Sequence, residues 1–440
     1  MSAIPCRRCF RLLSSIEPFM LRQLSTLALL FVLFVSTGKP ASAQEWTRFR
    51  GPNGTGVSAA ANMPVEWGAD DYRWKISLPG KGHGSPVVWG NRLFVNAERE
   101  DGGTRVVICV DTRDGSTLWS RDFEASNHKK HKVNSFASST PVVDDKHVYV
   151  SWAVPKKLTL LALDHEGNEV WNADLGPFKG GHGFAGSPIV YGEMIILGND
   201  QDGKSSLIAV DRNNGNVLWN VPRRSKRITY STPCVYAPKG RDPVLIFTNW
   251  QHGITAINPT NGKTVWEKPV FLLTRKERAI GSPVIAGDLV IGTCGFVTAE
   301  KHVVAVRPGK SGKPDDVEEV WRIERGVPHI PTALVHKDRV YLWSDKGIVT
   351  CANAQTGKTV WMKRVGGNYL GSPICVNDRL YSINDAGEVV VIAASDEYKL
   401  LARNPLGERS QSTPAVAGGM MFLRSLSHLY AVGGRAEDAK

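Results

Sequence analysis

One short stretch decides the fold: Val210-Asp-Arg-Asn-Asn-Gly-Asn-Val-Leu-Trp219. Its apolar ends flank a polar centre, which predicts the end of one strand, a tight turn and a second strand that closes on a tryptophan. The Asn214-Gly215 pair is a strong hairpin signal, because glycine accepts the positive φ that such a turn requires.

The same hairpin recurs at intervals of about 40 to 55 residues, the range of propeller blades. The copies run from Val110 to Trp119, Leu163 to Trp171, Ile257 to Trp266, Val306 to Trp321, Ala352 to Trp361 and, without a tryptophan, Ile392 to Leu401. A second mark, Ser/Thr-Pro before an apolar run, follows at Ser85, Thr140, Ser187, Thr232, Ser282, Ser372 and Thr413, with Thr332-Ala333 as an eighth copy that lacks the proline. We therefore expect eight repeated units of four short antiparallel strands.

The two ends of the repeat region complement each other. The last unit has only three strands, at Ala415–Ala417, Met420–Leu423 and His428–Val432, and a spare strand lies at Tyr72–Leu78. Pairing them completes the eighth blade and leaves the ring without an open edge. The expected fold class is all-β, an eight-bladed propeller of four-stranded antiparallel blades, closed by the N-terminal outer strand.

The hairpin that ends in tryptophan resembles the tryptophan-docking motif of pyrroloquinoline-quinone (PQQ) repeat propellers, over about Tyr72 to Val432. That family contains quinoprotein alcohol dehydrogenases and non-enzymatic scaffolds such as the outer-membrane assembly lipoprotein BamB. Residues Trp46 to Ser58 resemble the mature start of secreted members from planctomycete-type bacteria. The resemblance implies that each tryptophan packs between neighbouring blades. The residues concerned are Trp74, Trp119, Trp171, Trp219, Trp266, Trp321 and Trp361.

Residues 1–43 are expected to be a signal peptide, with Met20 as an alternative start. The apolar run Leu27–Val35 is too short to span a membrane, and Ala41-Ser42-Ala43 fits a cleavage site after Ala43. No cysteine follows the run, so a lipid anchor is not expected. The chain should then be secreted or periplasmic. The remaining segments are expected to be a strap at 44–71, the propeller at 72–432 and a disordered tail at 433–440.

The strap is expected to pack on one face of the ring, with Trp46 and Phe49 as apolar anchors. A ligand role for Arg48 or Arg50 is the alternative. Five cysteines follow the leader, and we expect most to be buried free thiols, since these are common core residues. They are Cys109, Cys234, Cys294, Cys351 and Cys375.

Function is expected on the face that carries the links between blades, because loops on a rigid scaffold usually hold binding sites. Basic residues outnumber acidic ones in these links, within a chain of net charge +12, and such a field attracts anionic partners. The candidate ligand-binding residues are Lys81, His83, His131, His182, Arg223, Arg224, Lys226, Arg227, Arg275, Lys276, Arg278, His329 and Arg409.

Several functions lack support in the sequence. The histidines have no metal-ligand spacing, no nucleophile elbow is present, and a Cys-Cys pair and a C-x-x-C-H haem motif are both absent. Asn199-Asp200, Asp345 and Asn384-Asp385 could supply calcium ligands but are also ordinary hairpin residues. Nucleic acid is disfavoured, because the basic residues are not interleaved with stacking aromatics.

We therefore expect a monomeric, non-catalytic binding or scaffold module with no catalytic residues, metal or cofactor. Its partner would be an acidic polymer, another anionic ligand or an envelope protein. The alternative is a PQQ-dependent quinoprotein oxidoreductase of the alcohol or sugar dehydrogenase type, and PQQ with calcium belongs only to this alternative.

Overall fold

The structure is a computed structural model that describes residues 45–60, 63–225, 227–271, 277–296, 298, 300–309 and 316–434. The chain divides into two units, Met1–Ala41 and Ser42–Lys440. The expected signal peptide and its cleavage site lie outside the described residues, as do 435–440 of the expected tail. All described strands belong to the second unit.

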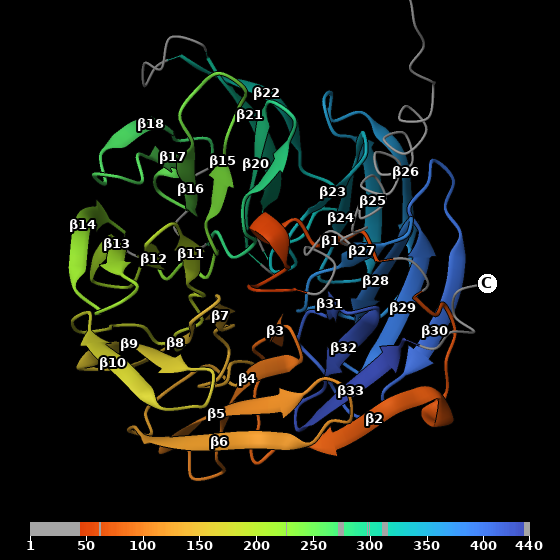
Figure 1. Cartoon of the computed structure of the whole chain (residues 1–440). Helices are drawn as coiled ribbons and strands as arrows, with labels where there is room; N and C mark the ends of the chain where they lie inside the picture. Colours follow the sequence, from red (N-terminus) through yellow and green to blue (C-terminus); the bar gives the residue numbers. More distant parts are fainter. Residues whose placement is uncertain are drawn as a thin grey trace, which may run out of the picture. The chain divides into compact units, whose positions relative to one another are not determined.

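Eight antiparallel blades of four strands each are arranged in a ring around a central axis (Figure 1). Blades one and two contain β3 (Val87–Trp89), β4 (Arg92–Glu98), β5 (Thr104–Asp111) and β6 (Thr117–Glu124), then β7 (Val142–Val143), β8 (His147–Val154), β9 (Lys157–Asp164) and β10 (Glu169–Asp174). Blades three and four contain β11 (Ile189–Tyr191), β12 (Met194–Asn199), β13 (Lys204–Asp211) and β14 (Val217–Arg224), then β15 (Cys234–Tyr236), β16 (Val244–Asn249), β17 (Gly253–Ile257) and β18 (Thr264–Lys268).

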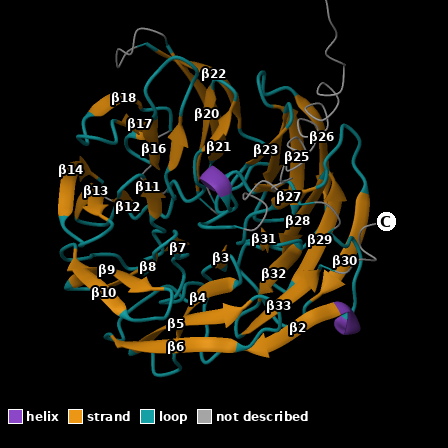
Figure 2. Ribbon diagram, in the orientation of Figure 1, coloured by secondary structure: helices purple, strands orange, loops and turns teal. Residues whose placement is uncertain are grey.

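The second half of the ring repeats the arrangement. Blades five and six contain β19 (Val284–Ala286), β20 (Leu289–Gly295), β21 (Lys301–Pro308) and β22 (Val317–Ile323), then β23 (Leu334–His336), β24 (Arg339–Trp343), β25 (Ile348–Asn353) and β26 (Thr359–Arg364). Blades seven and eight contain β27 (Ile374–Val376), β28 (Arg379–Ile383), β29 (Glu388–Ala393) and β30 (Leu400–Pro405), then β31 (Ala415–Ala417), β32 (Met420–Arg424), β33 (His428–Gly433) and β2 (Tyr72–Ser77). Strands dominate, and the helices of the described part are the short 3₁₀ segments η2 (Pro52–Gly54) and η3 (Ala69–Asp71) (Figure 2).

The expected fold class and ring closure are confirmed. β2 pairs antiparallel with β33, so the outer strand of blade eight comes from the N-terminal side of the ring. The inner strands are buried on both faces because blades stack on each other, which explains their continuous apolar runs. Val106 to Val110 of β5, for example, are all at most 1% exposed.

The tryptophans lie between blades, as the resemblance implied. All seven are at most 9% exposed. The Trp171 indole donates to the Arg212 carbonyl oxygen of the next blade at 2.9 Å, and Gly215 of that blade's turn lies against the ring. A Cβ at Gly215 would lie 2.8 Å from the indole, and the residue has φ +78°. The turn glycine therefore serves both the turn and the interface. Equivalent indole bonds are made by Trp74, Trp119, Trp219, Trp321 and Trp361.

A β-bulge precedes each tryptophan. In blade three the register shifts between Val217 and Trp219, which leaves Leu218 as the extra residue on β14. Leu218 is 52% exposed while Trp219 is 8% exposed. Blade seven lacks a tryptophan, and Ala402 occupies its register position beside the bulge. Met63 and Trp67 from the N-terminal side join the same core cluster as Ala402.

The hydroxyls of the Ser/Thr-Pro marks form what we call the hydroxyl ring. It consists of Ser85, Thr140, Ser187, Thr232, Ser282, Thr332, Ser372 and Thr413. In seven of the eight steps around the described ring, the backbone N–H of one member donates to the hydroxyl of the next blade at 2.9–3.1 Å, and the last of these bonds runs from Thr413 to Ser85. Among the described residues the step from Ser187 to Thr232 lacks this bond.

Residues 45–58 of the strap lie in the centre of the ring, so the expectation that the strap packs on one face is wrong for this part. Met63 and Trp67 of the strap instead pack against blades seven and eight. Trp46 bridges antiparallel to Val88 of blade one, and β1 (Val57–Ser58) adds a parallel strand to β27 of blade seven. Figure 1 shows η2 near the ring axis. The strap therefore enters from the face of the β-hairpin turns, turns at Phe49 and Arg50, and returns toward the face it came from.

Two buried arginines fix the strap to the inner strands. Arg48 donates to the Pro233 carbonyl oxygen at 2.5 Å. Arg50 is fully buried and donates to the carbonyl oxygens of Ala333 at 2.9 Å and Pro373 at 3.3 Å. These contacts give both arginines a structural role and link blades four, six and seven through the centre.

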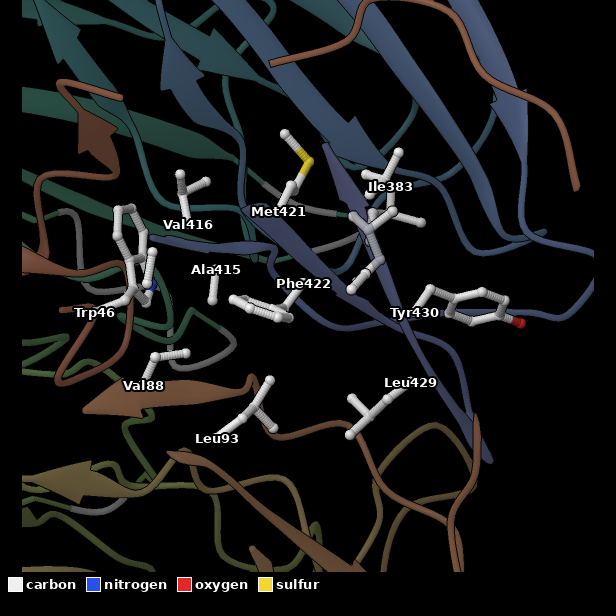
Figure 3. Close-up of a cluster of buried hydrophobic side chains, with 14 of the residues drawn as sticks. Trp46, Val88, Leu93, Ile383, Ala415, Val416, Met421, Phe422, Leu429 and Tyr430 are labelled. Carbon is white, nitrogen blue, oxygen red and sulfur yellow. The ribbon is translucent and has the colours of Figure 1, made fainter. Parts of the chain in front are cut away.

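Trp46 also completes a hydrophobic cluster between blades one, seven and eight (Figure 3). Val88 and Leu93 come from blade one, and Met421 and Phe422 come from blade eight. The five cysteines Cys109, Cys234, Cys294, Cys351 and Cys375 are buried free thiols, as expected. Within the described part of the chain, no helix has the length and apolarity to span a membrane.

Candidate functional site

A cavity of 320 Å³ lies at the mouth of the central channel. Its walls come mainly from the links between blades, so it opens on the interblade-link face. The hydroxyl ring and Phe49 of the strap also line it. The polar wall residues besides the hydroxyl ring are His83, His131, Asn134, Ser138, His182, Tyr230, Arg278, His329 and Gln411. The apolar ones are Phe49, Val133, Ala185, Ile280, Phe296, Ile330 and Leu370.

Arg278 is the one lysine or arginine among these lining residues. Its backbone exchanges two hydrogen bonds with Gly295 at the end of β20, at 2.9 and 3.1 Å. The residue is only 5% exposed, and its Nε lacks a hydrogen-bond partner. Burial lowers the pKa of the guanidinium. No described carboxylate forms an ion pair with it, although the charge of Asp202 opposes the lowering of its pKa. The guanidinium therefore faces the cavity without a directly bonded counter-ion.

His182 and His131 form one edge of the entrance. Their rings stack with centroids 5.0 Å apart, and Asn134 donates to the His182 carbonyl oxygen at 2.6 Å. Arg278 Nη2 lies 3.5 Å from His182 Nδ1. Burial, followed by the nearby Arg278 charge, lowers the pKa of His182. A neutral His182 can therefore accept a hydrogen bond beside the guanidinium.

His83 is held in a loop whose glycines allow close approach. Arg424 of β32 is completely buried and donates from Nη1 to the Gly84 carbonyl oxygen at 2.7 Å. A Cβ at Gly82 would collide with the Arg424 guanidinium, so the loop needs glycine there. Burial, followed by the charges of Arg424 and Arg409, lowers the pKa of His83 to about 3.

His329 forms the opposite wall. Asp345 accepts the backbone N–H groups of His329 and Ile330 at 2.8 and 3.0 Å, which fixes this loop against blade six. The residue is 3% exposed, and both ring nitrogens lack protein partners. Burial lowers the pKa of His329 to about 4 despite the opposing effect of Asp345. The imidazole is neutral at pH 7 and can donate from one nitrogen and accept at the other.

The structure brings five of the candidate ligand-binding residues together in the cavity: His83, His131, His182, Arg278 and His329. Arg224 and Arg409 are exposed away from the lining, and Lys81 pairs with Glu100 at 3.2 Å. Arg227 is half-buried near the entrance loops. Lys226, Arg275 and Lys276 lie outside the described residues.

Arg223 is not the exposed loop residue that the sequence suggested. Strand β14 extends through Arg224, and its alternation turns Arg223 inward and Arg224 outward. The Arg223 guanidinium lies 3.5 Å from the Asp200 carboxylate, and both side chains are 4% exposed. This buried pair makes Arg223 structural rather than available to a ligand.

Sequence reasoning missed two parts of the cavity and one residue that supports it. The hydroxyl ring was interpreted only as a set of strand starts, although eight hydroxyls at equivalent positions of a ring must surround its axis. Phe49 was assigned to a face instead of the channel. Arg424 does not line the cavity but supports the His83 loop, and it could have been found as the charge that ends the otherwise apolar strand β32.

The cavity does not suit a calcium-assisted quinone site. Calcium requires six to eight oxygen ligands, usually including carboxylates. The described lining contributes neither aspartate nor glutamate. Asp345 uses its oxygens on backbone N–H groups and on Lys301 at 3.3 Å. Over the described ranges, no group of three or more His, Cys, Asp or Glu side chains is placed to hold a metal ion.

Comparison with known proteins gives one family and several similar folds. The family model described as outer membrane protein assembly factor BamB matches residues 65–139, 103–313 and 299–423. The structure of BamB from Moraxella catarrhalis has a TM-score of 0.59 at 14% identity, covering 82% of this chain and 98% of that chain. No curated protein sequence matches the chain.

Two dehydrogenases share the fold as well. A europium-containing methanol dehydrogenase has a TM-score of 0.53 at 11% identity, covering 89% of this chain and 98% of that chain. The quinohemoprotein alcohol dehydrogenase ADHIIG from Pseudomonas putida HK5 has a TM-score of 0.53 at 12% identity, covering 90% of this chain and 81% of that chain. At these identities the likeness concerns the fold alone.

Proposed function

This chain belongs to the family of outer membrane protein assembly factor BamB, and from that premise we propose that it is an extracytoplasmic, non-catalytic module that binds an acidic polymer. The membership confirms the resemblance drawn from the tryptophan hairpins. The planctomycete-type detail, the signal peptide and the monomeric state stay predictions.

The observation that carries the proposal is the channel-mouth cavity, where hydroxyls and imidazoles surround the guanidinium of Arg278. None of the described lining residues forms the nucleophile, base and orienting partner that acyl transfer requires. Buried groups that lack partners and converge on a cavity instead favour recognition of a ligand that supplies the missing contacts.

Exposed basic residues around the cavity support an anionic polymer as the partner. We call them the basic rim: Lys129, Lys132, Lys179, Arg224, Arg325, Arg364 and Arg409. They project from several blades of the interblade-link face, so a chain with repeated negative charges could contact several at once. Arginine is suited to bidentate contacts with carboxylate or sulfate.

The test is binding of polygalacturonate and dextran sulfate to the purified protein, with neutral dextran as the control polymer. Binding should weaken steeply as salt rises, since the rim charges are exposed to solvent. The double variant Arg224→Ser/Arg364→Ser should bind several-fold more weakly. The matched variant Lys263→Ser/Lys358→Ser removes two charges from the hairpin-turn face and should bind as the wild type does. No binding at low salt would refute the proposal.

A quinoprotein oxidoreductase is the second candidate, favoured by the folds shared with the two dehydrogenases. Its test is to mix the protein with PQQ and calcium and to measure quinone binding and dye reduction with alcohols or sugars. Saturable PQQ binding with alcohol-dependent turnover would place this candidate first. The donor set of the cavity leads us to expect neither.

A further inference from the structure

The unpaired Arg278 guanidinium calls for a negatively charged ligand group. Burying an ion without a counter-charge costs several kcal/mol, and proteins normally pair such groups. Here the side chain lines the cavity at 5% exposure with its Nε unpartnered. A carboxylate of a ligand could accept two parallel N–H bonds from the planar guanidinium.

The rest of the polar wall calls for a ligand rich in hydroxyl groups. His329 has two buried ring nitrogens without partners and His83 has one, Nδ1. Each hydroxyl of the ring accepts at most the backbone N–H of the preceding blade, and within the described part of the chain none donates onward to a protein group. The walls thus offer neutral hydrogen-bond donors and acceptors rather than further charged groups.

The size of the cavity and its apolar surfaces further restrict the class of ligand that fits. The cavity of 320 Å³ lies at the small end of ligand pockets, which span about 300–1,000 Å³, so it suits a compact ligand such as one sugar ring. Phe49 closes the inner end, and Phe296 lies against His329 with ring centroids 6.0 Å apart. Aromatic faces suit the C–H face of a saturated ring whose edge carries hydroxyls.

We propose that the channel-mouth cavity binds one uronic-acid residue, with its carboxylate on Arg278, its hydroxyls on His83, His329 and the hydroxyl ring, and its ring against Phe49 and Phe296. The inference rests on the proposed function and deepens it, because it assigns recognition of one sugar unit to the cavity and attraction of the polymer to the basic rim.

The experiment is calorimetric titration of the purified protein with galacturonic acid and, as the neutral match, galactose. We expect saturable one-to-one binding of galacturonic acid and at least tenfold weaker binding of galactose. Arg278→Gln should weaken galacturonic acid binding by at least tenfold and leave galactose binding nearly unchanged. Equal binding of the two sugars by the wild type would overturn the inference, and that comparison needs no variant to fold.

The rim variant separates this inference from the proposed function. Arg224→Ser/Arg364→Ser should bind galacturonic acid as the wild type does while losing affinity for polygalacturonate. If the monomer binds and the polymer does not, the cavity assignment stands and the polymer partner fails. If the polymer binds and the monomer does not, the rim alone acts and the cavity assignment is wrong. Unchanged galacturonic acid binding by Arg278→Gln would also overturn the assignment.

Discussion

The hairpin-turn face and the interblade-link face of the ring satisfy their polar groups differently. On the first, Trp171 donates to Arg212 and packs on Gly215, and the same contact recurs from blade to blade. On the second, Arg278, His83 and His329 keep buried nitrogen atoms without protein partners. The difference teaches that the repeat stabilises the ring, while the links between blades are free to hold unsatisfied groups for a ligand.

The largest effect should follow the loss of a docked tryptophan. Trp219→Ala removes an indole that is 8% exposed and bonded to the Pro259 carbonyl oxygen at 2.8 Å. We expect the free energy of unfolding to fall by about 3–5 kcal/mol, as measured by urea denaturation. The control is Leu218→Ala at the exposed bulge, where the change should stay within about 0.5 kcal/mol. Similar losses at both positions would contradict the docking interpretation.

Lowering the pH should destabilise the protein through His329 on the interblade-link face. The folded protein holds the pKa of His329 at about 4, whereas an unfolded histidine titrates near 6.5. Between these values the unfolded chain binds the extra proton, so the free energy of unfolding should fall as the pH drops from about 6.5 to about 4. The contribution is complete above pH 6.5 and amounts to about 3 kcal/mol, since one pKa unit corresponds to about 1.4 kcal/mol. His329→Gln should flatten this part of the pH profile, and an unchanged slope would show that His329 is not responsible.

The turn glycines allow the tryptophan contact to be measured apart from backbone strain. Gly215 and Gly240 have φ +78° and +77°, but a Cβ at Gly215 would meet Trp171, whereas nothing lies within 4 Å at Gly240. Both alanine variants should lose about 1 kcal/mol from the positive φ. Gly215→Ala should lose at least a further 1 kcal/mol from the displaced indole. Thermal unfolding of the two variants would show whether that difference exists.

The smallest predicted effect is a gain in stability rather than a loss. Arg278→Met replaces a buried, unpaired cation with an apolar side chain of similar length. We expect the free energy of unfolding to rise by about 1 kcal/mol, because binding sites commonly sacrifice stability for function. Chemical denaturation without ligand would measure it. A loss above 2 kcal/mol would mean that Arg278 holds the cavity wall together and that the two faces do not differ as described.

The sequence was sufficient to predict the features that repeat in every blade, and insufficient to predict the features that occur once. The repeat spacing predicts the docked tryptophans, the turn glycines and the closing strand, because every blade packs against its neighbour in the same way. The strap could not be placed, because its depth depends on the width of a channel formed by strands far away in the sequence. Arg223 and Arg224 could have been separated if the strand after Trp219 had been extended through Arg224, since side chains alternate between the buried and the exposed side along a strand.

The hydroxyl ring has a consequence for what enters the channel. Each of its hydroxyls can rotate its proton toward a donor or an acceptor, as a water molecule does, but its oxygen is anchored by the inner strand of a blade. The hydroxyl ring therefore offers a ligand hydrogen bonds like those of a hydration shell, but from oxygen atoms at fixed positions. A ligand that leaves bulk solvent finds similar partners already in position, so little reorientation is needed on entry and little selectivity arises from these groups. Selectivity must come from the few wall groups that cannot switch between donating and accepting a hydrogen bond, above all the guanidinium of Arg278.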